Sequence, residues 1–157
     1  NEELPETNPT LEDNALQKAQ YVYQNYGFNC FADDTGLEID ALGGAPGVYS
    51  ARYAGEDCRV EDNMNKVLDK LDGIKQRNAK FRTVIALIID GEATLFEAEC
   101  KGNITNTKSG AEGFGYDPIF IPNGFEKTFA EMSKAEKGKI SHRGKAVKKL
   151  VGFLSTN

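Results

Sequence analysis

Two adjacent aspartates, Asp33 and Asp34, are the side chains of this sequence best suited to acid–base or metal chemistry. They follow the short apolar stretch of residues 28–32 and precede the dipeptide Thr35-Gly36. An ionised carboxylate at the end of a buried strand loses hydration, so it usually persists because it binds a cation, activates a water or caps a turn. Consecutive side chains of an extended chain point to opposite faces, so the two aspartates are not a ready-made catalytic pair. An Asx-type turn remains the alternative.

Two glycine-rich stretches could bring the backbone close to a ligand. Residues 43–47, GGAPG, could direct N–H groups at phosphate oxygens, but they do not match the GxxxxGKS/T pattern of phosphate-binding loops. Residues 113–118, GFGYDP, set Phe114 and Tyr116 among glycines. Such glycines let a ring lie flat against a planar ligand, although packing of the rings in the core is the more frequent explanation. Each pattern alone is a weak signal.

Cations gather at the expected start of the last helix. Lys137, Ser141, His142 and Arg143 fall in one short stretch, and His142 is the only histidine of the chain. Positive side chains near the positive end of a helix dipole are unfavourable by about 0.3 to 1 kcal/mol. A bound anion or carbonyl would remove this penalty. A lone histidine is more often structural than catalytic, so both interpretations of His142 stay open.

Hydrophobic periodicity predicts the elements that position these side chains. An apolar stripe predicts an amphipathic helix over residues 11–26, capped by Thr10 and ended by Gly27. Lys18 lies at the margin of this stripe, where a snorkelling lysine is the common explanation. The opposite, wet face is predicted to carry Gln17, Gln20 and Gln24. Residues 28–32 then read as a short buried strand that delivers Asp33 and Asp34.

The rest of the chain alternates between strand and helix patterns. The expected elements are a helix over 57–71, strands over 80–89, 93–105 and 116–121, and a helix over 141–154. Asp90-Gly91 predicts a type I′ turn between the two long strands. The core-facing side chains of the last helix are expected to be Val147, Leu150, Val151 and Leu154. We therefore expect a single α/β domain over residues 1–157 with a mixed sheet.

Composition excludes several classes of protein. No apolar run approaches the roughly 20 residues that span a bilayer, and no signal peptide is expected. The net charge of −5 argues against a general nucleic-acid coat. The three cysteines, Cys30, Cys58 and Cys100, lack CxxC spacing and fit reduced thiols in the cytoplasm.

The charges are unevenly distributed along the chain. Residues 1–40 hold nine Asp or Glu and one lysine, whereas residues 134–149 hold seven Lys or Arg and one glutamate. The acidic and basic ends could face each other across a cleft, or they could be two solvated surfaces. The counts leave both alternatives open.

Three ordered blocks resemble the signature of one protein family. They are ADDTGLEIDALGGAPGVYSARYAG (residues 32–55), GFGYDPIF (113–120) and KAEKGKISHRGKA (134–146). From Leu4 to about Leu154 the chain is similar to the inosine triphosphate pyrophosphatase (ITPase, dITP/XTP pyrophosphatase) family. The resemblance implies an α/β fold with two lobes around a long mixed sheet, helices on both faces and a central cleft. It also implies a cytoplasmic, Mg²⁺-dependent homodimer that hydrolyses ITP, dITP and XTP to the monophosphate and pyrophosphate, with no nucleic-acid or membrane partner.

The resemblance implies a role for each matching residue. Asp34 corresponds to the catalytic metal ligand that activates the attacking water, and Asp33 and Glu6 to supporting carboxylates of the Mg²⁺ site. Lys18 matches the lysine that reaches the phosphates, which favours function over snorkelling, and Thr35 stands where relatives often carry serine. The residues that match those around the purine base are Phe114, Gly115, Tyr116, Asp117, Lys137, Ser141, His142 and Arg143.

One feature of the family is missing from this sequence. Relatives begin with a strand and a loop of the form Ser/Thr-x-Asn-x-x-Lys, which cradles the triphosphate, and no such block precedes Leu4. The alternative interpretation is therefore a truncated, non-catalytic nucleotide-binding or dimerisation module of the same fold. We favour an enzyme whose first strand, phosphate loop and helix lie outside this sequence.

Overall fold

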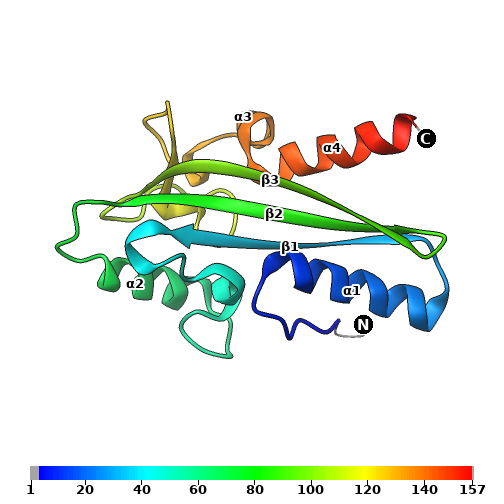
Figure 1. The fold of residues 1–157 in the computed structure, drawn as a ribbon. Coiled ribbons are helices and arrows are strands. Elements are labelled where there is room, and N and C mark those ends of the chain that lie inside the picture. The colour runs from blue at the N-terminus through cyan, green and yellow to red at the C-terminus, as the bar shows by residue number, and fades with distance from the viewer. Residues whose placement is uncertain (1–3, 157) are drawn as a thin grey trace.

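A long antiparallel sheet with helices on both faces organises the chain (Figure 1). The structure is a computed structural model, and it describes residues 4–156 of the predicted domain. Its helices and strands are α1 (Leu11–Tyr26), β1 (Cys30–Ile39), α2 (Val60–Lys70), β2 (Asn78–Ile89), β3 (Glu92–Ile104), β4 (Phe120–Pro122), α3 (Lys134–Ile140) and α4 (His142–Thr156). The described short 3₁₀ helices are η1 (Asp40–Leu42), η2 (Gly47–Arg52), η3 (Asp117–Ile119) and η4 (Phe129–Glu131).

The sheet has the strand order β1-β2-β3-β4, and each strand pairs antiparallel with its neighbour. The predicted α/β class is therefore confirmed, but within residues 4–156 the sheet is antiparallel and not mixed. β2 and β3 form the predicted hairpin, in which Ile89 lies opposite Glu92. Asp90 and Gly91 between them have φ angles of 52° and 85°, the positive values that a type I′ turn requires.

β1 is longer than the sequence predicts and begins later. It continues through both aspartates, so Asp33 and Asp34 lie within the strand and not at its end. Asp33 is opposite Ile85, which packs in a cluster with α4, and Asp34 is opposite Val84, which packs in a cluster with α1. The two carboxylates consequently project from opposite faces of the sheet, as predicted from the alternation of an extended chain.

α1 forms over the predicted residues. The Thr10 hydroxyl accepts a hydrogen bond from the backbone N–H of Asp13, and Gly27 ends the helix with a φ of 71°. Its small residues Ala15 and Ala19 are fully buried against β2. A helix so anchored fixes the positions of the polar side chains on its flanks.

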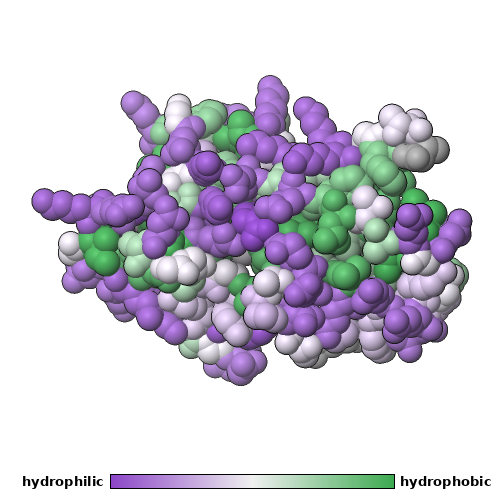
Figure 2. All heavy atoms as spheres, viewed as in Figure 1, coloured by the Kyte–Doolittle hydropathy of each residue, from purple (hydrophilic) through white to green (hydrophobic). Residues whose placement is uncertain are grey.

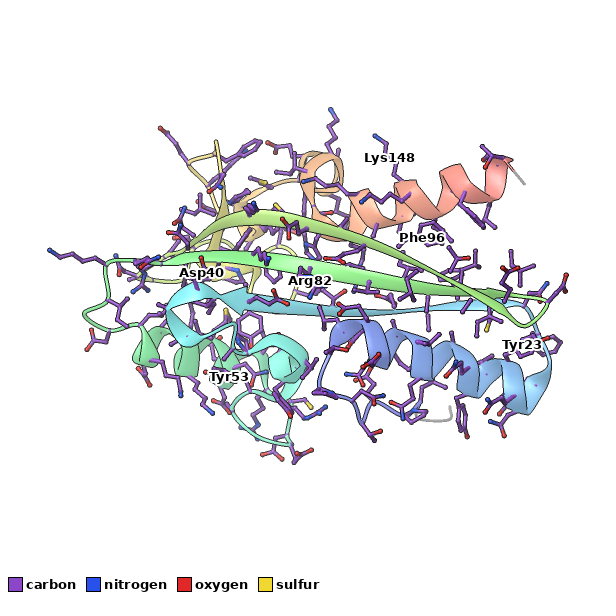
Figure 3. The ribbon with its side chains drawn as sticks, viewed as in Figure 1. Tyr23, Asp40, Tyr53, Arg82, Phe96 and Lys148 are labelled. Atoms are coloured by element: carbon purple, nitrogen blue, oxygen red, sulfur yellow. The ribbon has the colours of Figure 1, made fainter. Side chains whose placement is uncertain are left out.

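α4 is rotated relative to the prediction. Leu150 is buried as expected, but Val147, Val151 and Leu154 are 44%, 53% and 46% exposed. The sheet is instead covered by Ala146 and Leu150, while Phe153 packs on Phe96 between β3 and α4 (Figure 3). The buried stripe and the predicted stripe of α4 therefore share only Leu150. Figure 2 shows the apolar surface along α4 and the adjoining strands.

The two ends of the sheet carry different elements (Figure 1). α1 and α4 cover one end, while α2 and η2 gather beneath the other. The core at this second end is aromatic, with Phe81, Phe120 and Phe129 in mutual ring contact. This arrangement fits the expected two lobes. In the part of the chain that is described, none of the helices combines the length and the apolar character needed to cross a membrane.

Candidate active site

A cleft of about 350 Å³ opens on the α4 side of the sheet, where β1, α2, the loop before η3 and the start of α4 converge. Its walls contain Thr35 and most of the residues that the family resemblance places around the base: Phe114, Gly115, Tyr116, Asp117, His142 and Arg143. Other lining residues include Leu37, Cys58, Asn63 and Phe81. The fold thus brings together three blocks, of which the first, at Thr35, lies 79 positions before Phe114 in the sequence.

Phe114 is the exposed aromatic surface of the cleft. The residue is 61% exposed, the Lys137 Nζ atom lies 4.4 Å from the ring centroid, and the Arg143 guanidinium carbon lies 5.5 Å from it. An exposed ring with two cations beside it can stack on a planar ligand while the cations donate to acceptors at the ligand's edge.

Asp117 links the side chain of Lys137 to the backbone of Phe114. It is buried, and its Oδ2 atom accepts from Lys137 Nζ at 2.5 Å and from the Phe114 backbone N–H at 3.0 Å. The chain passes so close here that a Cβ on Gly113 would lie 2.2 Å from this oxygen. Asp117 therefore fixes both the ammonium of Lys137 and the backbone of Phe114.

Tyr116 and Ser141 each make a hydrogen bond to a backbone group of the protein. The Tyr116 hydroxyl donates to the Ser50 backbone carbonyl at 2.6 Å, and burial raises the pKa of this phenol. The Ser141 hydroxyl accepts from the Gly144 backbone N–H at 3.0 Å, so the predicted N-cap is in place at the start of α4. Both groups have a protein partner, so their contribution to ligand binding is indirect.

His142 is buried beneath the cleft. Its ring stacks on Phe81 with centroids 4.7 Å apart, and its Nδ1 atom has no hydrogen-bond partner among the described residues. Burial lowers the pKa of His142 to about 3, and the positive charges of Arg143, Lys137 and Lys145 act in the same direction. At neutral pH the imidazole is therefore uncharged, and the cations beside the cleft are Lys137 and Arg143.

We expect the imidazole of His142 to stay neutral from pH 8 down to about pH 4. The unfolded chain gains a proton near pH 6.5 and the folded chain only near pH 3, so the free energy of unfolding decreases as the pH falls below 6.5. The single histidine gives one Cε1–H NMR signal, whose chemical shift should be constant over this range. A titration midpoint near 6.5 would contradict the prediction, and His142→Phe, which keeps a ring against Phe81, should lose this part of the acid sensitivity.

A second polar group lies on the α1 side of the sheet. Lys18 Nζ donates to Glu6 Oε1 at 2.6 Å, to the Asp33 backbone carbonyl, and lies 3.8 Å from Asp34 Oδ1. Its side chain is only 12% exposed, so Lys18 does not reach out to solvent as a snorkelling lysine would. One ammonium thus contacts two carboxylates that are 28 positions apart in the sequence.

Within this group, the carboxyl of Asp34 is poorly solvated and has a raised pKa. Burial raises the pKa of its carboxyl to about 6 and the nearby Glu6 adds to the shift, whereas the Lys18 ammonium and a hydrogen bond from Asn14 oppose it. Its Oδ2 atom is buried and has no hydrogen-bond partner within residues 4–156. An unpartnered buried carboxylate oxygen is costly, which points to a ligand at this atom.

Asp33 does not join this group through its side chain. Its Oδ2 atom lies 3.4 Å from Arg143 Nη2, and the same nitrogen lies 3.4 Å from the Thr35 hydroxyl. The structure therefore argues against the predicted role of Asp33 beside Asp34 in a metal site, because the two carboxylates face opposite sides. It also brings the acidic and basic ends of the chain into contact at the Asp33–Arg143 pair.

The cleft and the polar group formed by Lys18, Glu6 and Asp34 meet at β1. Asp34 belongs to the polar group of Lys18 and Glu6, and the next residue, Thr35, lines the cleft, where its hydroxyl is 2.9 Å from that of Thr83. β1 is an edge strand of the described sheet, so a ligand can pass along its edge from one face to the other. An extended ligand with a planar end and an anionic end suits this arrangement.

Several residues of the site escaped the sequence analysis. Phe81 stacks on His142 and Thr83 is fully buried, yet both lie in a strand pattern that gives no functional signal. The one local sign is that Thr83 is a polar residue within an apolar run. Asn63 on α2 accepts from the Ala54 N–H and donates to the Ala51 carbonyl, which ties the cleft wall to α2. Such contacts depend on tertiary structure and leave no local pattern.

Similarity to known proteins extends over nearly the whole chain. Residues 1–153 match the sequence model of the Ham1 family. The dITP/XTP pyrophosphatase of Flavobacterium johnsoniae is 56% identical over 154 residues, which are 98% of this chain and 80% of the relative, and that of Bacillus subtilis is 51% identical over 156 residues, 98% and 79% of the two chains. The solved structure of the Staphylococcus aureus Ham1 protein superposes with a TM-score of 0.94 at 43% identity, covering 98% of this chain and 81% of the other. That of a Coxiella burnetii HAM1 protein gives 0.95 at 37% identity, with 99% and 82% coverage.

Proposed function

Because the chain belongs to the Ham1 family, we propose that it hydrolyses ITP, dITP and XTP to the nucleoside monophosphate and pyrophosphate. It would thereby remove deaminated purines from the nucleotide pool. The observation that carries the proposal is the arrangement at β1: an aromatic, cation-flanked cleft lies on the side that Thr35 faces, and the carboxylates of Glu6 and Asp34 lie together with Lys18 on the opposite side. The relatives named dITP/XTP pyrophosphatase support the same substrates.

The cleft supports selection by the edge of the purine base. Hypoxanthine and xanthine present a keto oxygen at position 6, an acceptor that Arg143 and Lys137 can meet with N–H donors. Adenine presents an amino group there, so donors would face donors and remain unpaired. Discrimination built on an unpaired buried donor can reach about 10⁴-fold. Phe114 would stack on either base and contribute affinity without this selectivity.

The carboxylate group fits Mg²⁺, which we propose as the cofactor. Glu6 and Asp34 offer hard oxygen ligands, and the unpartnered Oδ2 of Asp34 is a ready donor. No cluster of three His, Cys, Asp or Glu side chains suited to a metal occurs among the described residues. This is compatible with Mg²⁺, which is commonly held by one or two carboxylates together with phosphate oxygens and water. When bound, Mg²⁺ would neutralise phosphate charge and make a bound water more acidic.

The protein groups have distinct tasks in the proposed hydrolysis. Asp34 orients the attacking water and accepts its proton, and the unpartnered Oδ2 atom is available for that contact. Lys18 is anchored by Glu6 and carries the positive charge that stabilises the phosphate oxygens as bonds change. Phe114 and Arg143 hold the base, so that the α-phosphate stays near Asp34.

Release of pyrophosphate tests the proposed function directly. We expect ITP and XTP to be cleaved with kcat/KM at least about 100-fold above that of ATP, because only the keto bases satisfy the cleft donors. Pyrophosphate and orthophosphate are measured separately with Mg²⁺ present. Equal turnover of ATP, or orthophosphate as the first product, would contradict the proposal. Binding of ITP in calorimetry without turnover would instead support a non-catalytic nucleotide-binding module.

We also propose that the protein is a homodimer in the cytoplasm. The proposal is supported by the family resemblance, by exposed apolar residues such as Phe31 and Val151, and by free cysteines at positions 30, 58 and 100. Sedimentation velocity at micromolar concentration should give the mass of two chains. A monomer at all concentrations would contradict the dimer.

A further inference from the structure

The segment that carries Glu6 is held to α1 by polar contacts. None of residues 4–10 is fully buried, and none belongs to a hydrophobic cluster of the described chain. Apolar packing therefore does not fix Glu6. Its position relative to Asp34 has to come from hydrogen bonds.

Gln17 supplies three of these hydrogen bonds. Its Oε1 atom accepts from the Thr7 backbone N–H and from Asn8 Nδ2, both at 2.9 Å, and its Nε2 atom donates to the Thr7 hydroxyl at 2.8 Å. Gln17, which was predicted on the wet face of α1, is only partly exposed because residues 7 and 8 lie against it. Gln20 and Gln24 are exposed, as predicted.

Asn14 holds the neighbouring residue in the same way. Its Oδ1 atom accepts from the Asn8 backbone N–H at 2.8 Å and its Nδ2 atom donates to the Asn8 carbonyl at 3.1 Å. Asn14 is buried, and its amide is near enough to the Asp34 carboxylate to lower the pKa of that group. One side chain thus binds the segment that carries Glu6 and lies beside the second carboxylate.

The three residues of α1 that make these contacts lie on adjacent turns. Asn14 and Lys18 are four positions apart and face the same side of the helix, with Gln17 next to them. Lys18 contacts Glu6 and Asp34 themselves, whereas Asn14 and Gln17 hold the backbone beside Glu6. The helix therefore acts as a common frame for the two carboxylates.

We propose that Asn14 and Gln17 form an amide clamp that positions Glu6 beside Asp34 and thereby sets the affinity of this carboxylate pair for a divalent cation. The inference rests on the proposed Mg²⁺ site and identifies positioning residues for it. A cation bound by only two carboxylates needs both at a fixed separation, and a loose segment would have to be ordered when the cation binds. Loss of two or three neutral hydrogen bonds should weaken binding about tenfold.

Gln17→Met tests the clamp, with Gln20→Met as the matched control. Methionine keeps the length of the side chain and removes its hydrogen bonds, and position 20 lies on the same helix in solvent. The probe is Mn²⁺ alone, whose free concentration is read by electron paramagnetic resonance. We expect about tenfold weaker Mn²⁺ binding for Gln17→Met and no change for Gln20→Met.

Hydrogen exchange distinguishes local loosening of residues 7 and 8 from a general loss of stability, which would also speed exchange of the β2 amides. The Thr7 and Asn8 amides should be protected in the wild type and in Gln20→Met, and the Thr7 amide should exchange faster in Gln17→Met while the amides of β2 do not. In turnover, kcat at low Mg²⁺ should fall and recover at high Mg²⁺, with an unchanged KM for ITP.

Several results would overturn the clamp. They are equal Mn²⁺ affinity of the two methionine variants, unchanged exchange at Thr7, no Mn²⁺ binding by the wild type, or Mn²⁺ binding that Asp34→Asn does not weaken. Because Mn²⁺ binding and amide exchange are measured without nucleotide, failure of the clamp is distinguishable from failure of the proposed hydrolysis.

Discussion

Replacing Asp34 by Asn is expected to abolish pyrophosphate release and, at the same time, to raise the melting temperature. The amide cannot accept the proton of the attacking water and is a poor ligand for Mg²⁺, so kcat should fall by about 1,000-fold or more. The gain in stability follows from burial, because the wild-type carboxylate lies where its charge is poorly solvated.

The sign and size of the stability change follow from the pKa of Asp34. The pKa is raised from 3.8 to about 6 in the folded protein, so between these values the folded chain binds more protons than the unfolded chain. The free energy of unfolding therefore decreases as the pH rises through this window, and above pH 6 the ionised carboxylate costs about 2 to 3 kcal/mol. Asparagine removes this cost, which corresponds to a rise of about 6 to 9 °C at pH 7.

Calorimetry at pH 7 and pH 4 without divalent cation measures this effect. The difference in melting temperature between Asp34→Asn and the wild type should be present at pH 7 and nearly vanish at pH 4, where Asp34 is protonated. Asp33→Asn is the matched control, since its carboxylate is on the other face and 44% exposed. It should change kcat at most a few-fold, through Arg143. An active Asp34→Asn enzyme would exclude Asp34 as the catalytic carboxylate.

Much of the cleft could be predicted because its residues carry local signals. Glycines beside Phe114 and a cluster of polar residues around Ser141 are visible in the sequence, and the alternation of an extended chain separates Asp33 from Asp34. The bounds of α1 could be predicted equally well from the sequence, since Thr10 and Gly27 mark its ends. Whether these residues act on a nucleotide rests on the family resemblance.

What could not be predicted depends on contacts between distant residues. Two overlapping apolar stripes on α4 share Leu150, and only the packing of Phe153 on Phe96 shows which stripe faces the sheet. Gln17 has the sequence context of a surface residue, because its partners Thr7 and Asn8 reach it only when the preceding segment folds back along α1. The length of β1 was underestimated because two aspartates interrupt its apolar pattern, although its pairing with β2 continues through them.

Lys137→Met should have the second largest effect, on both stability and activity. The Asp117 and Lys137 side chains are 4% and 16% exposed and make an ion pair at 2.5 Å. Removal of the ammonium leaves the Asp117 carboxylate buried without its counter-charge, which should cost about 3 kcal/mol and lower the melting temperature by about 9 °C. The cation beside Phe114 is lost as well, so we expect kcat/KM for ITP to fall by about 100-fold.

The double variant Asp117→Asn/Lys137→Met separates the two effects. An asparagine at position 117 keeps an oxygen for the Phe114 N–H but carries no charge, so the buried carboxylate and its cost disappear together. Thermal unfolding should return close to the wild-type midpoint, whereas ITP hydrolysis should stay low because the donor for the base is still missing. If activity returned together with stability, Lys137 would act only by compensating the charge of Asp117. Low stability in the double variant would instead show that methionine disturbs the packing around Phe129, whose ring centroid lies 5.5 Å from Lys137 Nζ.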